Sequence, residues 1–295
     1  MNTILQTALD LTELSRAMQI AREAVLGGTD WIEAGTPLIK SEGMNAVREL
    51  AKEFPNHKII ADLKTSDTGG LEVEMAAKAG ADVVCILASA DDAVIADALR
   101  GASLYGVELM ADMMNVTDVA GRAKQLADMG VHIINAHVGI DQQMEGKNPL
   151  DILSEISGLG VKVAAAGGLN AETAAAAAAA GADIVIVGAG IVKAADVETA
   201  ARAVREAIDS PAAAKPKTKT VDDEIREILN EVSAPHVTDA LYRKGAMSGI
   251  YARHVPKKMV GKAVTVQTFG GDWSKPVQAI DVCEKGDVLV INNSE

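Results

Sequence analysis

The sequence predicts a parallel (β/α)8 barrel, the TIM-barrel fold, over residues 1–209, followed by a linker at residues 210–220 and a small α/β segment at residues 221–295. Three observations predict this organisation: a glycine repeat, short apolar strands that alternate with helix-like stretches, and a break in the pattern after Ser210. Strands that alternate with helices form a parallel sheet, and eight such units in about two hundred residues fit a closed barrel.

The glycine repeat gives the strand count. Gly28, Gly80, Gly130 and Gly181 are separated by 52, 50 and 51 residues, and each stands between a helix-like stretch and an apolar strand. Glycine just after a helix adopts the left-handed conformation that ends the helix. A period of this length is too long for one βα unit and suits two, so four repeats give eight strands.

The remaining four strands are expected midway between these glycines. Their predicted ranges are Thr3–Leu9, Lys58–Leu63, Ser103–Met110 and Val161–Ala165. Several strand runs are apolar almost throughout, which is typical of strands covered on both faces. The alanine run Ala174–Ala180 is expected in the seventh helix, because alanine is the strongest helix former.

The pattern changes after the barrel. Residues 211–219 consist of proline, alanine, lysine and threonine without periodicity, which is typical of an exposed linker. Beyond it, Val221–Val232 has helical periodicity and Ser233–Tyr242 is a second helix candidate, while Ala263–Phe269 and Asp287–Ile291 are expected to be strands. These elements would make a small α/β segment.

Composition excludes several classes of function. A hydrophobic content of 48% supports a sizeable core, but the aromatic content of 2% leaves no stacking surface for single-stranded nucleic acid. The formal net charge of −13 argues against binding to any nucleic-acid backbone. A small phosphorylated substrate is compatible with this charge, because it needs only a local site.

The cysteines and the N-terminus predict a cytoplasmic protein. Cys85 and Cys283 lie far apart in the chain and are expected to be buried, reduced thiols. No apolar run is long enough to cross a membrane, and Met1-Asn2-Thr3 does not resemble the start of a signal peptide. We therefore expect no membrane partner.

The candidate chemistry centres on Asp62-Leu63-Lys64-Thr65-Ser66-Asp67, at the end of the third predicted strand. Side chains alternate along a strand, so Asp62 and Lys64 are expected to face the same side, with Asp67 in the following loop. An ordinary ion pair that closes the strand would explain Asp62 and Lys64 alone. Other strands also end in ionisable residues, namely Asp10, Glu33, Asp112 and His137. Because strand ends meet at one mouth of an α/β barrel, these residues together predict an active site there.

The last two strands end in glycine-rich turns instead. Gly167 and Gly168 follow strand seven, and Gly188, Ala189 and Gly190 follow strand eight. Such turns bring backbone N–H groups close to an anion, and a helix N-terminus follows each. Tight turning would explain either turn alone, but barrels often bind a substrate phosphate at this position, so we expect a phosphate site.

Acids, a lysine and a phosphate site together suggest a phosphosugar that passes through an enediolate. Glu33 and Asp62 are hard oxygen ligands on neighbouring strands and are expected to bind Mg²⁺. The cation and Lys64 would stabilise the developing oxyanion, and His137 would carry the proton.

These residues resemble the orotidine 5′-phosphate decarboxylase superfamily over about residues 1–209. Asp62-x-Lys64-x-x-Asp67 matches the superfamily signature, and Asp10 and Glu33 match the acids on its first two strands. Within the superfamily, the stretches 33–40 and 137–142 most closely resemble the 3-hexulose-6-phosphate synthase family. The sibling 3-keto-L-gulonate-6-phosphate decarboxylases typically have an arginine in place of Ile140 and another in the strand-eight loop, where this chain has none.

The resemblance implies a lyase of the aldolase type. It would reversibly join formaldehyde and D-ribulose 5-phosphate into D-arabino-hex-3-ulose 6-phosphate, with Mg²⁺, Asp62, Lys64 and His137 in the catalytic site and Asp10 and Asp112 at the substrate. It also implies a homodimer in which Asp67 reaches the neighbouring subunit's site. Two alternatives stay open: the sibling decarboxylase, and a regulatory protein that acts through its C-terminal segment.

Residues 221–295 resemble the start of the ribonuclease-activity-regulator-A-like proteins, which are related to a class of metal-dependent aldolases. The stretches 233–241 and 286–291 carry this resemblance. The metal and substrate residues of that family are expected downstream of Val290, and the sequence, which runs to Glu295, ends before them. We therefore expect no catalytic role for this segment.

Overall fold

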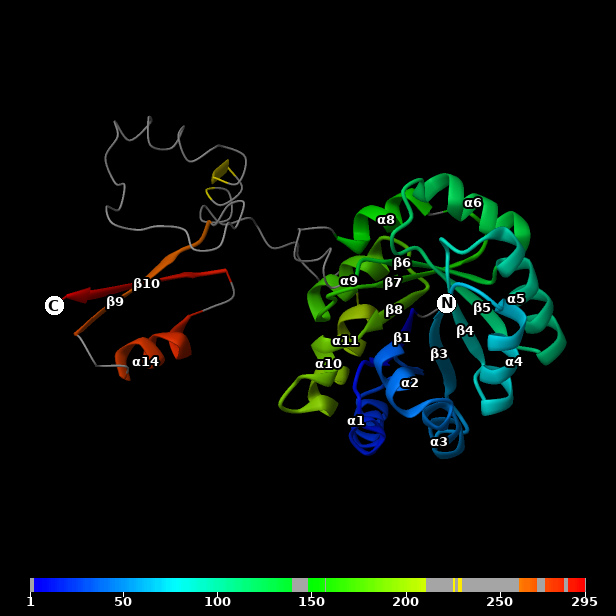
Figure 1. The fold of residues 1–295 in the computed structure, drawn as a ribbon, viewed down its shortest axis with the longest axis horizontal. Helices are drawn as coiled ribbons and strands as arrows, with labels where there is room; N and C mark the ends of the chain where they lie inside the picture. The colour runs from blue at the N-terminus through cyan, green and yellow to red at the C-terminus, as the bar shows by residue number, and fades with distance from the viewer. Residues whose placement is uncertain are drawn as a thin grey trace. The chain divides into compact units, whose positions relative to one another are not determined.

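The structure is a computed structural model that describes residues 3–139, 148–156, 158–210, 225, 228–229, 260–269, 274–283 and 286–294. The chain divides into two compact units, Met1–Pro216 and Lys217–Glu295. Figure 1 shows that helices surround the strands of the first unit. The described residues of the second unit include two strands and a helix. No helix in the described part of the chain is long and apolar enough to span a membrane.

Eight parallel strands close the first unit into a barrel, with β8 paired back onto β1. The strands are β1 (Ile4–Leu9), β2 (Trp31–Ala34), β3 (Lys58–Thr65), β4 (Val83–Leu87), β5 (Glu108–Asp112), β6 (Ile133–His137), β7 (Lys162–Ala166) and β8 (Ile184–Val187). The predicted (β/α)8 fold is therefore confirmed.

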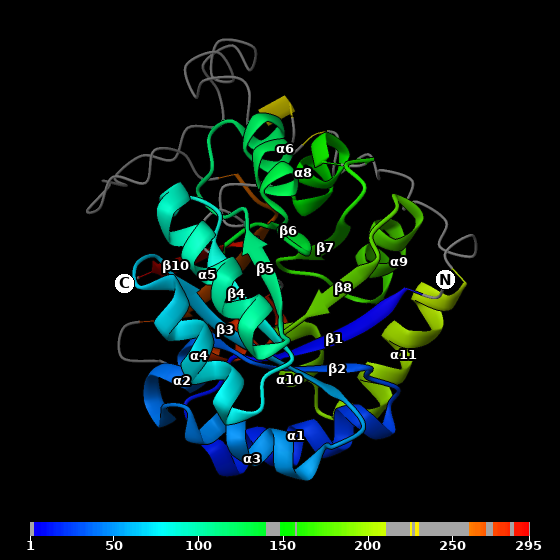
Figure 2. The ribbon, with the colours of Figure 1, turned by 90° about the vertical axis from the view of Figure 1, so that its right-hand side faces the viewer.

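Helices cover the outside of the strands, as Figure 2 shows. They are α1 (Leu14–Leu26), α2 (Thr36–Glu42), α3 (Asn45–Glu53), α4 (Gly69–Ala79), α5 (Asp92–Tyr105), α6 (Val119–Met129), α8 (Pro149–Ile156), α9 (Ala171–Ala179), α10 (Ala189–Val192) and α11 (Val197–Asp209). Strand side chains that face outward form the main core with these helices, and the alternate side chains fill the barrel interior. Small Ala8 and Ala166 lie in the interior layer and border the cavity described below.

The glycine repeat marks a repeated structure at the N-terminal ends of the strands. The four repeat glycines have φ angles between 96° and 100°, which L-residues with side chains rarely adopt. Two positions later, an aspartate carboxylate accepts a 2.8 Å hydrogen bond from the backbone of the preceding strand. These pairs are Asp30 with Leu5 N–H, Asp82 with Ile59 N–H and Asp183 with Val163 N–H.

The third repeat uses a different side chain for the same contact. His132 Nδ1 accepts a 3.0 Å hydrogen bond from Leu109 N–H. In all four repeats, the backbone N–H of the accepting residue donates in return to the carbonyl of its partner, over 2.8 to 3.2 Å. We call each reciprocal pair a latch; the four latches join β1 to β2, β3 to β4, β5 to β6 and β7 to β8.

One predicted strand, Ser103–Met110, is wrong at its start. Residues up to Tyr105 complete α5, Gly106 ends that helix at φ 73°, and β5 begins at Glu108. Leu104 made the stretch look like an apolar strand, but its side chain is 76% exposed on the last helical turn. The other predicted barrel strands differ from the structure by one or two residues at their ends. The alanine run lies in α9, which begins earlier, at a capping box formed by Asn170 and Thr173.

The second unit contains a parallel pair, β9 (Ala263–Phe269) and β10 (Val288–Ser294), with α14 (Ser274–Val282) between them. The predicted strand at Ala263–Phe269 has these bounds, and the one at Asp287–Ile291 continues to Ser294. The predicted linker beyond Ser210 and the helix candidate Ser233–Tyr242 lie outside the described residues, as does most of Val221–Val232. Both cysteines are free thiols; Cys85 is buried as expected, whereas Cys283 is only half-buried.

We predict that Asp82→Ala lowers the free energy of unfolding of the barrel by about 1 kcal/mol, because the Ile59 N–H loses its side-chain acceptor. Urea denaturation of the full chain measures this change. Asp128→Ala is the control, since Asp128 forms only an exposed ion pair with Lys124 one helical turn away. It should change stability by less than about 0.5 kcal/mol. Equal effects of the two substitutions would contradict a stabilising role for the latch.

Candidate active site

A cavity of about 450 Å³ opens at the C-terminal ends of the strands, where the sequence predicts the active site. We call it the mouth cavity. Ten residues singled out from the sequence line it: Asp10, Glu33, Asp62, Lys64, Asp112, His137, Gly167, Gly168, Gly188 and Ala189. The other lining residues are Ala8, Thr36, Pro37, Cys85, Met110, Met114, Asn135, Gly139, Ala166, Ile186, Val192 and Lys193. The structure thus brings most of the predicted site residues together.

Four carboxyl groups line this cavity, those of Asp10, Glu33, Asp62 and Asp112. Glu33 on β2 and Asp62 on β3 are buried, and Asp10 follows β1. Burial and the charges of Asp62 and Asp10 raise the pKa of Glu33 well above its usual value, although Gln6 Nε2 donates to Glu33 Oε2 at 2.5 Å. Burial and Asp62 also raise the pKa of Asp10, against the opposing charge of Lys64. Negative charge is therefore in excess here, which favours binding of a cation.

Lys64 lies between two of the acids. Its Nζ is 3.0 Å from Asp62 Oδ2 and 2.9 Å from Asp112 Oδ2. Burial disfavours the ammonium ion, but the two carboxylates outweigh burial and raise the pKa of Lys64 above its usual value, so it stays charged. The backbone of Lys64 has φ 49°, within a stretch of β3 where the register with β4 shifts. Such a conformation is uncommon for a residue with a side chain and is often found at functional sites.

Asp112 holds Lys64 and His137 in one place. Its Oδ2 accepts hydrogen bonds from Lys64 Nζ at 2.9 Å and from His137 Nδ1 at 2.7 Å, and its Oδ1 accepts one from Met114 N–H at 2.9 Å. Although burial opposes ionisation, the His137 and Lys64 contacts lower the pKa of Asp112 to about 2. An ionised carboxylate with three donors suits an orienting role. With Nδ1–H bonded to Asp112, His137 keeps Nε2 for proton exchange.

The turn after β2 contacts two of the acids, Asp62 and Asp10. Thr36 Oγ lies 2.8 Å from the carbonyl oxygen of Asp62 and 2.7 Å from its Oδ2, so it fixes the orientation of that carboxylate. A Cβ atom on Gly35 would lie 2.3 Å from Asp10 Oδ1, so only glycine fits there. α2 begins directly after Gly35, and Pro37 lies in its first turn, where proline is well tolerated.

The glycine turns differ in their contributions. Gly167 and Gly168 have φ angles of 114° and 65° and line the mouth cavity together with Gly188 and Ala189. Gly190 does not line it. A Cβ on Gly190 would lie 2.6 Å from the carbonyl oxygen of Leu169, so close packing of the two turns explains this glycine.

Asp67 also lies outside the mouth cavity of its own barrel. It is exposed in the loop after β3, where its Oδ1 accepts a 2.8 Å hydrogen bond from Thr68 N–H. The stretch from Ile140 to Gln142, which distinguishes the two sibling families, lies outside the described residues.

Several polar residues that line the mouth cavity, or that bond to a lining residue as Gln6 does to Glu33, were missed from the sequence. Gln6 and Asn135 are buried polar residues within apolar strands, and the free-energy cost of burying such groups is a signal that would have found them. Thr36 begins α2 two residues after β2, in a stretch that the sequence analysis used only for its family resemblance. Lys193 follows β8 at a distance, just after α10, so its position gave no signal.

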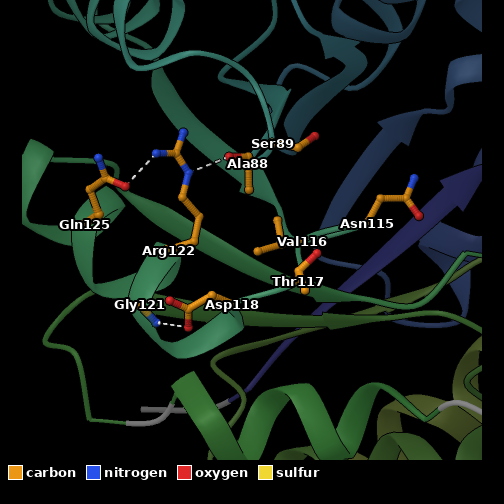
Figure 3. Close-up of a pocket in the computed structure, with 9 residues that line it drawn as sticks. All are labelled: Ala88, Ser89, Asn115, Val116, Thr117, Asp118, Gly121, Arg122 and Gln125. Carbon is orange, nitrogen blue, oxygen red and sulfur yellow. Dashed lines mark hydrogen bonds between the residues drawn. The ribbon is translucent and has the colours of Figure 1, made fainter.

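A second hollow, of about 470 Å³, lies over the ends of β4 and β5 and is shown in Figure 3. Its main charged group, Arg122, already donates to the carbonyl oxygens of Ala88 and Ala90 and to Gln125 Oε1, each at 2.7 Å. Asp118 accepts a hydrogen bond from Gly121 N–H and caps α6. Arg122 and Asp118 thus already have hydrogen-bond partners within the protein. The mouth cavity is therefore the stronger candidate for the active site.

Comparison with known proteins agrees with the fold. Residues 3–204 match the family model of the orotidine 5′-phosphate decarboxylase / HUMPS family, and residues 234–295 match the Aldolase/RraA model. The chain is 41% identical over 201 residues to the 3-hexulose-6-phosphate synthase of Bacillus subtilis (strain 168), an alignment that covers 67% of this chain and 95% of that protein.

Solved structures give the same result. The crystal structure of 3-hexulose-6-phosphate synthase from Salmonella typhimurium is 34% identical with a TM-score of 0.67, over 70% of this chain and 98% of that one. A 3-keto-L-gulonate-6-phosphate decarboxylase from Vibrio cholerae is 31% identical with a TM-score of 0.64, over 71% of this chain and 98% of that one. The resemblances predicted for the barrel and for the C-terminal segment are confirmed, and the chain belongs to the orotidine 5′-phosphate decarboxylase / HUMPS family.

Proposed function

We propose that the barrel reversibly joins formaldehyde to D-ribulose 5-phosphate and forms D-arabino-hex-3-ulose 6-phosphate through an enediolate. The observation that carries this proposal is the group of Lys64, Asp112 and His137 beside Glu33 and Asp62, in a barrel 41% identical to a 3-hexulose-6-phosphate synthase. The group combines a fixed positive charge, a proton carrier and carboxylates for a cation in one cavity. Since the substrate is an intracellular phosphosugar, we place the enzyme in the cytoplasm.

The crowded carboxyl groups fit a divalent cation, and we propose Mg²⁺. The raised pKa of Glu33 reflects unfavourable negative charge that a bound cation would relieve. Glu33 and Asp62 would hold the ion, with water completing its shell, because Mg²⁺ usually keeps several waters and needs only one or two carboxylates. The described residues contain no group of three or more His, Cys, Asp or Glu side chains that could hold a metal. When bound, Mg²⁺ supplies positive charge beside the substrate oxygens.

The chain's own residues would carry the remaining steps. His137 Nε2 takes the proton from the sugar carbon that becomes the nucleophile. That carbon then bonds to the formaldehyde carbon, and His137 returns the proton to the formaldehyde oxygen. Lys64 stabilises the sugar oxygen that becomes negative, and Asp112 keeps both side chains in place. Backbone N–H groups at the turns of Gly168 and Ala189 bind the phosphate.

We also propose a homodimer in which Asp67 enters the mouth cavity of the neighbouring subunit. Asp67 is exposed and lies outside its own cavity. On the adjoining helix α4, Leu71 and Met75 are 57% and 45% exposed and one helical turn apart. These apolar side chains suit an interface that would cover them.

We predict that Lys64→Ala and Asp62→Ala each lower turnover at least about a hundredfold, because each removes charge at the reacting oxygens. The assay follows formaldehyde-dependent consumption of ribulose 5-phosphate, and EDTA should abolish it in the wild-type protein. Lys52→Ala, an exposed lysine on α3, is the control and should keep full activity. Retained turnover in either site variant would refute the role assignment.

The same preparation tests the alternatives. CO2 release from 3-keto-L-gulonate 6-phosphate without any reaction of ribulose 5-phosphate would favour the sibling decarboxylase. Absence of both reactions, together with a co-purifying protein partner, would favour a regulatory function of the C-terminal segment.

We predict that Glu33→Gln stabilises the metal-free protein while it abolishes activity. The pKa of Glu33 is raised in the folded state, so its ionisation destabilises the fold as the pH rises above about 4.5, the usual carboxyl value. The variant should therefore melt at least about 2 °C higher than wild type at neutral pH, with the difference disappearing in acid. Thermal melts in EDTA across this pH range measure the effect, and a lower melting temperature for the variant at neutral pH would contradict it.

We predict that inactive Lys64→Ala and Asp67→Ala subunits regain activity when they form mixed dimers. If Asp67 acts in the neighbouring site, one of the two sites in each mixed dimer keeps both residues intact. Coexpression with two different affinity tags isolates the mixed dimers for assay. Mixed dimers as inactive as both parents would show that Asp67 does not act across the interface.

A further inference from the structure

Asn135 is a buried polar side chain whose Oδ1 has no hydrogen-bond partner among the described residues. It lies on β6, two residues before His137 and on the same face of the strand, and is 5% exposed. Its Oδ1 is closed off from solvent and accepts no hydrogen bond, and no contact of its side chain with another described residue meets hydrogen-bond criteria. It lines the mouth cavity.

The neighbouring strands offer Asn135 no partner. It stands in register with Asp112 on β5 and with Ala164 on β7. The oxygens of Asp112 are taken by other donors, and Ala164 has only a methyl group. The layer beneath is apolar and includes Met110 and Ile133. An amide in such a place is costly unless something in the cavity bonds to it.

We propose that Asn135 binds a hydroxyl group of the sugar phosphate and helps to select the sugar; this inference rests on the proposed function. A carboxamide donates through Nδ2 and accepts through Oδ1, so a turn of the side chain toward the sugar would match it to a hydroxyl group, which also donates and accepts. A carboxylate at this position would add to the negative charge beside Asp112, whereas the amide adds none. Because Asn135 lies two residues deeper than His137, roughly 7 Å along the strand, the hydroxyl belongs to the most deeply inserted part of the sugar.

Asn135→Ala and Asn135→Leu test the inference. The alanine variant should bind ribulose 5-phosphate about tenfold more weakly in calorimetric titration, with a matching fall in kcat/KM, because one hydrogen bond is lost. The leucine variant should melt no lower than wild type, because it replaces an unpartnered amide in apolar surroundings. Ile133→Val is the control: this side chain lies on the same face of β6 and does not line the cavity, so kcat/KM should stay unchanged.

Monodeoxy analogues of ribulose 5-phosphate separate a hydrogen bond from a structural effect. One analogue should bind the wild-type protein more weakly than ribulose 5-phosphate and bind wild type and Asn135→Ala equally, which identifies the recognised hydroxyl. An equal loss for every analogue would overturn the inference, as would equal affinity of wild type and Asn135→Ala for ribulose 5-phosphate. Failure of the wild-type protein itself to bind ribulose 5-phosphate would overturn the proposed function and this inference with it.

Discussion

The carboxylate of Asp112 is 2% exposed, yet it is ionised, because Lys64, His137 and the backbone of Met114 all donate to it. A charge at this depth is tolerable only with such donors. In return, the carboxylate fixes an ammonium group and an imidazole at one side of a single cavity. Lys64 then contacts Asp62, so the position of the neighbouring acid depends on the same carboxylate.

The carboxyl groups at the mouth serve the proposed chemistry but destabilise the fold locally. Glu33 and Asp62 lie above an interior layer that is almost wholly apolar. Gln6 donates a hydrogen bond to Glu33, and Thr36 and Lys64 donate to Asp62. Natural proteins tolerate such local strain where a ligand relieves it. The rest of the barrel is well packed and compensates for the unfavourable electrostatics at its mouth.

The eight strands and the position of the mouth could be predicted from sequence, because left-handed glycines and strand-end acids are local signals. Leu104 shows where local signals fail, since an apolar residue at an exposed helix end resembles a strand residue. Gln6 and Asn135 are hidden within apolar runs, and only the closed barrel shows that they face inward. Asp67 cannot be placed from one chain, because its proposed contact is with a second copy.

The four latches lie at the closed end of the barrel, and the ionisable residues lie at the other end. The latches repeat with nearly one residue type, whereas the strand ends at the mouth carry aspartate, glutamate, lysine, histidine and glycine. The latches therefore do not depend on which reactive groups the mouth carries. Substitutions at the mouth could change the reaction while the latches at the N-terminal ends of the strands stay intact. One scaffold could in this way serve both an aldol lyase and a decarboxylase.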